Sequence, residues 1–245
     1  MSEQLKNYDL SSELIKIEDK KKFYTEMKTT AIVPVFNEGK TVKEVLTVLN
    51  NSDLVNDIIV VDDASSDDSL KKIKDVKSNK LRLISLKKNL GKSGAVKLAA
   101  QNLKTDILLF CDADLVNLKE EHIGQIIGPL KDGKTAMSVG LRDYGLIGNF
   151  LYKNGFFPLI AGERALSYSI FKNTIKNPFM KGYGLEPVLN YYCKENKIPV
   201  HKNIMKGLKQ TLKPKKWKHG AYLLAKEMFH IFSIILMLKM KIKNF

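Results

Sequence analysis

Short apolar runs alternate with longer amphipathic stretches along most of the chain. Fully apolar runs, unlike alternating ones, are typical of strands buried on both faces of a parallel sheet. Such runs lie at residues 30–35, 57–63, 81–86, 106–114 and 136–141. Between them, helical spacing predicts two helices, one carrying Val42, Val45, Leu46 and Leu49, the other Val96, Leu98, Ala99 and Leu103. This alternation predicts an α/β domain whose mostly parallel sheet is flanked by helices.

The two ends of the chain differ from this pattern. Residues 1–28 form a polar lead-in that lacks the apolar core of a signal peptide. Residues 213–245 are first basic and then apolar, and they predict a C-terminal helix. We therefore expect one domain over residues 29–212 of the 245-residue chain.

The chain carries a formal net charge of +15, and the excess is concentrated late. Residues 197–226 contain no acidic residue, whereas lysines crowd at positions 202, 206, 209, 213, 215, 216 and 218. Such a charge indicates an anionic partner: nucleic acid, a membrane surface or a phosphorylated substrate. The cysteines, Cys111 and Cys193, have neither disulfide nor metal-ligand spacing and lie in apolar surroundings, as expected of a cytoplasmic protein.

Acidic or amide side chains follow three of the predicted strands. "FNEG" follows the first strand, "DDASSDD" the second and "DAD" the fourth. Ligands of such sheets bind at the carboxyl ends of the strands, and a rim of acids repels itself unless a metal ion or ligand donors sit there. The alternative for the second cluster is purely local, since Asp and Ser also end strands and cap helices.

Asp112 and Asp114 are separated by one residue at the end of the fourth predicted strand. Residues i and i+2 of a strand point the same way, so both carboxylates can reach one hard divalent cation, with a nucleotide-sugar diphosphate completing its coordination. The alternative is a solvated turn. "NLGKSGAV" is not a P-loop, because position 86 is Leu rather than Gly. It predicts a loop that leads into a helix, with Lys92 either near a phosphate or simply exposed.

Four motifs, "IVPVFNE", "VVDDASSDDS", "NLGKSGAV" and "LLFCDADL", resemble in order and separation the nucleotide-binding half of GT-A glycosyltransferases, especially family 2. The resemblance implies a Rossmann-like GT-A fold, with a nucleotide-sugar half over residues 29–115 and an acceptor half over 116–212. It places Mg²⁺ or Mn²⁺ on Asp112 and Asp114, and it leaves a capping role to Ser65, Ser66 and Asp67. The implied nucleotide-sugar contacts are Pro34, Phe36, Asn37, Glu38, Asp62 or Asp63, Lys92, Asp112, Ala113 and Asp114.

"PLIAGERAL" and "FMKGYGLEPVLNYY" resemble the acceptor half of glucosyl-3-phosphoglycerate synthases and related small enzymes. The resemblance implies that Glu163 and Glu186 lie close to the sugar and acceptor, as candidate catalytic groups. It also implies that Arg142 and the turn containing Gly162 meet the acceptor. From the residues themselves, Arg164 is a further candidate for binding acceptor phosphate, and Tyr183 and Tyr144 are pocket candidates. Those enzymes place a histidine on the metal in a later segment. This chain has Gln210 there, with His201 or His219 nearby, so we assign no histidine ligand.

Simpler interpretations of the two glutamates remain open. Glu163 and Arg164 are adjacent, and an exposed ion pair between them would matter little. Glu186 precedes Pro187, which suits the first position of a helix, so Glu186 is also a candidate cap. Either glutamate could instead orient or deprotonate an acceptor hydroxyl. We expect His122 and His230 to be structural.

The sequence therefore predicts a metal-dependent glycosyltransferase that uses a UDP- or GDP-linked sugar. The acceptor would be a lipid-linked or polyprenyl phosphate, or a phosphorylated small molecule. One alternative is a nucleotidyltransferase, which usually has a basic Gly-rich loop where "FNEG" stands. Another is a nucleic-acid-binding module, but the lysine-rich stretch lacks interleaved aromatic residues apart from Trp217, so we expect no nucleic acid.

The apolar part of the C-terminal extension, residues 231–238, is far shorter than the ~20 residues of a membrane-spanning helix. Two arrangements remain. The helix either packs on the catalytic domain or lies in the bilayer interface, with the lysines on anionic headgroups. We favour the second arrangement, which predicts a peripheral protein on the inner face of the cell membrane.

Overall fold

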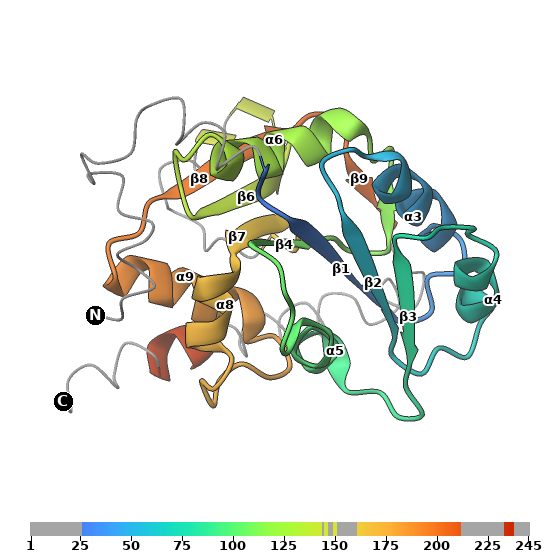
Figure 1. Cartoon of the computed structure of the whole chain (residues 1–245). Helices are drawn as coiled ribbons and strands as arrows, with labels where there is room; N and C mark the ends of the chain where they lie inside the picture. The colour runs from blue at the N-terminus through green and yellow to red at the C-terminus, as the bar shows by residue number, and fades with distance from the viewer. Residues whose placement is uncertain (1–25, 144, 147–148, 151–160, 212–232, 238–245) are drawn as a thin grey trace.

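The computed structural model describes residues 26–143, 145–146, 149–150, 161–211 and 233–237 (Figure 1). The strands are β1 (Thr29–Val35), β2 (Asp57–Asp62), β3 (Leu81–Ser85), β4 (Ile107–Phe110), β5 (Leu115–Val116), β6 (Met137–Arg142), β7 (Arg164–Ser167), β8 (Val200–Met205) and β9 (Lys209–Gln210). The helices that bear on the site are α3 (Val42–Asn51), α4 (Ser69–Lys74), α5 (Gly91–Ala100), α6 (Glu120–Lys131), α8 (Tyr168–Thr174) and α9 (Leu185–Glu195).

A seven-stranded sheet has the order β3-β2-β1-β4-β7-β6-β8, and β5 and β9 form a separate two-stranded sheet. Strands β1 to β4 are mutually parallel, as predicted, and β8 is parallel to β6. Strand β7 runs antiparallel to both β4 and β6. Because Phe110 at the end of β4 faces Arg164 at the start of β7, the chain before β7 reaches the same edge of the sheet as the loops after β1, β2 and β4.

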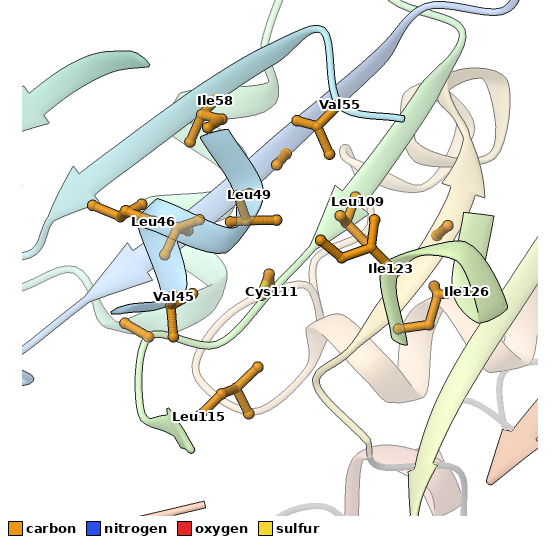
Figure 2. Packing of buried hydrophobic residues seen from close by; sticks show 14 of the residues in the cluster. Val45, Leu46, Leu49, Val55, Ile58, Leu109, Cys111, Leu115, Ile123 and Ile126 are labelled. Carbon is orange, nitrogen blue, oxygen red and sulfur yellow. The ribbon is translucent and has the colours of Figure 1, made fainter. Parts of the chain in front are cut away.

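Hydrophobic cores lie on both faces of the sheet. Side chains alternate along a strand, so Ala31, Val33 and Val35 of β1 enter one core and Ile32 enters the other. Helices α3 and α6 cover the first face, and α5, α8 and α9 cover the second. Figure 2 shows side chains of α3 and α6 over the strands of the first face. Two-sided burial explains why the strands read as continuous apolar runs.

Two details of the predicted pattern are wrong. Helix α5 ends at Ala100, so Leu103 lies beyond it, and Leu98 is 40% exposed. The face of α5 that packs on the sheet consists mainly of alanines, whose small side chains give a weak periodic signal. Strand β3 is not buried on both faces, because it is an edge strand, and Arg82 and Ser85 are exposed.

Both cysteines are buried, as predicted, and burial raises the pKa of Cys193 to about 12. The prediction for His122 is also confirmed: it is buried, its Nδ1 accepts the Lys119 amide and its Nε2 contacts the Lys206 carbonyl at 3.0 Å. His230, His219, Trp217 and Tyr144 lie outside the described residues, as do residues 1–25.

Of the C-terminal extension, the structure describes residues 233–237, which are helical. Ile234 is buried in the same core as Val188 and Cys193, whereas Leu236 and Met237 are largely exposed. At these residues the extension packs on the domain, which is the arrangement we did not favour. No helix within the described part of the chain has the length and hydropathy to cross a membrane.

Candidate active site

The loop after β1 and the acidic cluster after β2 are joined by hydrogen bonds. The Asn37 amide donates to Ser65 Oγ (3.0 Å), and Asn37 Oδ1 accepts the Ser66 amide (2.8 Å). Asp67 accepts the amides of Gly39 and Ser69. Ser65 and Ser66 therefore hold the neighbouring loop rather than cap α4, which corrects their predicted role, while Asp67 keeps part of it. Asn37 has φ 57°, in the left-handed region that Asn tolerates.

The two aspartates at the end of β2 have different partners. Both carboxylates of the pair are buried, and Asp63 accepts the backbone amides of Leu90 (2.7 Å) and Gly91 (2.8 Å). Asp62 has only longer contacts, from the Ser65 amide and Ser85 Oγ, both at 3.3 Å. Asp63 therefore holds the glycine loop before Lys92 against the sheet. The Asp62 carboxylate makes only the longer hydrogen bonds and is the more available of the two to a ligand.

The Asp63→Ala substitution is expected to lower the free energy of unfolding by about 1–3 kcal/mol, because it removes the acceptor of the Leu90 amide and leaves the Gly91 amide only its longer bond to Asn89 Oδ1 (3.1 Å). Chemical denaturation of the variant, with Asp53→Ala as the matched control, measures this effect. Asp53 is exposed, so its substitution should be nearly neutral. Equal stability of the two variants would show that Asp63 does not anchor the loop.

Lys92 bridges the two halves of the chain. Its Nζ lies 2.7 Å from Asp112 Oδ1 and 3.0 Å from Glu186 Oε1. Burial disfavours the ammonium, but Asp112 and Glu186 outweigh this and raise the pKa of Lys92 above its ordinary value. The lysine is therefore charged and paired, not simply exposed. Glu186 does not cap α9, because Gly184 is the N-cap residue and no side chain caps the helix; Pro187 is the third residue of that helix rather than the first.

Gly162 lies against the Asp112–Lys92 pair. A Cβ atom at this position would come within 2.1 Å of Asp112 Oδ2 and 2.6 Å of Lys92 Nζ. Any larger residue would displace the aspartate. The glycine of the "GE" turn thus lets the backbone approach the charged pair closely.

Glu163 and Arg142 form a buried ion pair. Arg142 Nη2 lies 3.0 Å from Glu163 Oε1, and the Glu163 side chain is only 3% exposed. Burial and the charge of Asp112 raise the pKa of Glu163, although Arg142 opposes this. Arg164 is fully buried, and its guanidinium donates to the Ala161 carbonyl and to Asn190 Oδ1. The interpretation of Glu163 and Arg164 as an exposed ion pair is therefore wrong.

Asp114 lies in the turn after β4, which ends at Phe110, so the strand geometry expected for the aspartate pair is not what aligns it. Its Oδ2 accepts Gln210 Nε2 at 2.7 Å, whereas Oδ1 is buried with no hydrogen-bond partner. Burial and the charge of Asp112 raise the pKa of Asp114. Arg142 Nη1 is likewise buried without a partner. The site thus holds one unsatisfied acceptor and one unsatisfied donor.

The remaining predicted contacts lie around these groups. Pro34 lies in β1, Phe36 and Tyr183 are largely exposed aromatic side chains, and the Glu38 amide donates to Ser69 Oγ. The Ala113 carbonyl accepts Thr41 Oγ1 at 2.8 Å. Sequence reasoning missed Thr41, which joins α3 to the aspartate turn, and the contact of Gln210 with Asp114. Neither has a local signal, because the partners are far apart along the chain.

The fold is that of a GT-A glycosyltransferase. A sequence model described as Glycosyl transferase family 2 matches residues 30–191. The chain therefore belongs to glycosyl transferase family 2. Glucosyl-3-phosphoglycerate synthase from Mycobacterium tuberculosis, solved with Mn²⁺, UDP and glucosyl-3-phosphoglycerate, superposes with a TM-score of 0.71 at 19% identity, over 91% of this chain and 84% of that one.

Two curated relatives resemble part of this chain more closely in sequence than that enzyme does. Dolichol-phosphate mannosyltransferase of Pyrococcus furiosus is 30% identical over 119 residues, which are 47% of this chain and 33% of that protein. Undecaprenyl-phosphate 4-deoxy-4-formamido-L-arabinose transferase of Proteus mirabilis is 29% identical over 123 residues, 47% of this chain and 37% of that protein. The match thus spans about a third of each relative's length.

Proposed function

We propose that this glycosyltransferase moves a sugar from a nucleotide-diphosphate sugar to a phosphate-bearing acceptor, with polyprenyl phosphate as the first candidate. The observation that supports it is that two buried atoms at one edge of the sheet lack a hydrogen-bond partner: a carboxylate oxygen of Asp114 and a guanidinium nitrogen of Arg142. A cation suits the first group and an anion suits the second. The names of the two curated relatives favour a lipid phosphate.

The donor would lie on the loops after β1, β2 and β4. Exposed Phe36 is suited to stack on a nucleobase, and Pro34, Asn37 and Glu38 would line the same pocket. Asp62, with its long contacts, is better suited than Asp63 to accept hydrogen bonds from a base or ribose. Glucosyl-3-phosphoglycerate synthase, which has this fold, is solved with UDP, and this makes UDP the nucleotide to test first.

The residues present fit a divalent metal at Asp114. Within the described ranges no three His, Cys, Asp or Glu side chains gather around one point. One or two carboxylates together with substrate phosphates are how Mg²⁺ is usually held, and Mn²⁺ accepts the same ligands. Asp114 would bind through its free Oδ1, and Asp112, already paired with Lys92, would stand beside it. When bound, the metal offsets the charge of the departing diphosphate.

The acceptor would approach from the side of Arg142, Gly162 and Tyr183. Arg142 would offer Nη1 to an acceptor phosphate while Nη2 stays on Glu163. Because a phosphate oxygen is already deprotonated at neutral pH, such an acceptor needs no general base. Glu163 would then position Arg142, and Glu186 would position Lys92. Arg164 would hold the turn at Gly162 through its hydrogen bond to the Ala161 carbonyl. Only an alcohol acceptor would need Glu186 as a base.

A lipid acceptor would bring the protein to the cytoplasmic surface of a membrane. Lys206 and Lys209 are exposed next to the site, and the lysine-rich stretch continues after them. Each lysine near an anionic surface contributes about 1 kcal/mol. We propose that this stretch holds the protein peripherally on anionic headgroups.

The donor assignment predicts metal-dependent stabilisation by one class of nucleotide sugar. UDP-, GDP- and dTDP-sugars, each with and without Mn²⁺, are compared by thermal shift. Transfer from the stabilising donor is then measured to undecaprenyl phosphate in mixed micelles and, separately, to 3-phosphoglycerate. We expect transfer to the lipid phosphate. Transfer to phosphoglycerate alone would show that the acceptor is a soluble phosphate rather than a lipid phosphate. The absence of stabilisation by any nucleotide sugar would refute the proposal.

A further inference from the structure

Gln210 is held beside Asp114 by the backbone on both sides of it. Strand β9 pairs antiparallel with β5, with Gln210 opposite Leu115. The next amide, that of Thr211, donates to the Asp114 carbonyl at 2.9 Å. The Gln210 side chain then reaches the Asp114 carboxylate, 2.7 Å from Nε2 to Oδ2. This contact joins residues 96 positions apart, and backbone pairing fixes where the amide lies.

The contact gives the two carboxylate oxygens of Asp114 different surroundings. Oδ2 is occupied by the amide, and the buried Oδ1 is left without a partner. A donor on one oxygen restricts rotation of the carboxylate about its own axis, so the other oxygen keeps one direction. The amide is also neutral. It therefore adds no further negative charge next to Asp112, which already repels Asp114.

We propose that Gln210 is a positioning residue that sets the affinity and selectivity of the site for divalent cations through Asp114. The inference rests on the proposed function, because it takes Asp114 as a cation ligand. Hydrogen-bond partners of metal ligands typically change metal affinity 10–100-fold when removed. Among the described residues, the metal ligands proposed for this site are carboxylate oxygens, which favour hard ions such as Mg²⁺ and Mn²⁺. An imidazole at position 210 would add a nitrogen donor and favour later first-row ions.

The affinity of the full chain for Mn²⁺ is measured by electron paramagnetic resonance titration in the presence of UDP. Gln210→Leu is expected to weaken Mn²⁺ binding by about 10-fold or more, while the metal-free protein unfolds at nearly the same temperature. Gln101→Leu, at an exposed glutamine on the end of α5, is the matched control and should bind as the wild type does. Binding by Gln210→Leu within twofold of the wild type would overturn the inference.

Selectivity is tested with Gln210→His and Co²⁺. We expect this variant to bind Co²⁺ more tightly than the wild type and to show a visible absorption spectrum changed by nitrogen ligation. An unchanged spectrum and affinity would refute the selectivity part of the inference. A wild-type protein that binds neither Mn²⁺ nor Co²⁺ with UDP would instead refute the metal assignment of the proposed function, so the two failures are distinguishable.

Discussion

Asp114→Asn should reduce sugar transfer about a thousandfold, or ~4 kcal/mol, which is within the several kcal/mol that charge stabilisation by a metal supplies. The substitution keeps the shape of the side chain and removes the charge of a carboxylate whose buried Oδ1 has no hydrogen-bond partner. Mn²⁺-dependent nucleotide binding should fall with it. Transfer rates at saturating donor, together with binding in the presence and absence of Mn²⁺, measure the effect.

The same variant should fold at least as stably as the wild type in metal-free buffer. The pKa of Asp114 is raised by burial and by Asp112, so the folded protein holds the proton more tightly than the unfolded chain does. Ionisation of Asp114 therefore costs stability as pH rises through the raised pKa, and asparagine avoids this cost. Asp75→Asn, at an exposed position, is the control. Full activity of Asp114→Asn would exclude Asp114 as a metal ligand.

Lys92→Met should be damaging in two ways. It removes the cation between Asp112 and Glu186, which costs roughly 2 kcal/mol of stability, less than the 3–5 kcal/mol of fully buried pairs because the lysine side chain is 31% exposed. It also lets both carboxylates move, and displacements of about 1 Å in a site can cost a hundredfold in rate. We expect at least that loss of transfer per folded molecule.

The controls for Lys92 separate charge from packing. Lys97→Met, on the same helix, should leave both stability and transfer close to wild type. Because the pKa of Lys92 is raised, its contribution to stability should persist at neutral and mildly alkaline pH and decline only as pH rises through the raised pKa. Lys92→Met with wild-type activity and stability would show that the bridge has no role.

The sequence was sufficient to predict strands β1, β2 and β4 and the polar loops that follow them. Strands β1, β2 and β4 are buried on both faces, so they appear as unbroken apolar runs, and their loops carry the motifs at one edge. Strands β7 and β8 were not predicted, because the four residues of β7 begin with Arg164 and end with Ser167 and so form no apolar run, and β8 is a half-exposed edge strand. The sense of β7 decides which edge Glu163 reaches, and no local pattern encodes it.

The pairings within the site were also beyond sequence reasoning. Lys92 appeared as a charge near a helix start, and its partners come from a turn after β4 and from α9. Arg142 was expected at the acceptor, and the structure adds its buried contact with Glu163. Spacing along the chain identifies residues that share an element. It does not identify side chains that meet because separate elements end at the same edge.

The reversed direction of β7 has a consequence for the order in which the chain folds. Strands β1 to β4 pair with one another using residues up to Phe110, whereas β7 must return to β4 from residues 164–167. Contacts between residues distant in sequence form late, because closing long loops costs entropy. Glu163, Glu186 and Gln210 all belong to this later part. A nascent or partly folded chain should therefore form the loops after β1, β2 and β4 before Glu163, Glu186 and Gln210 reach the same edge of the sheet.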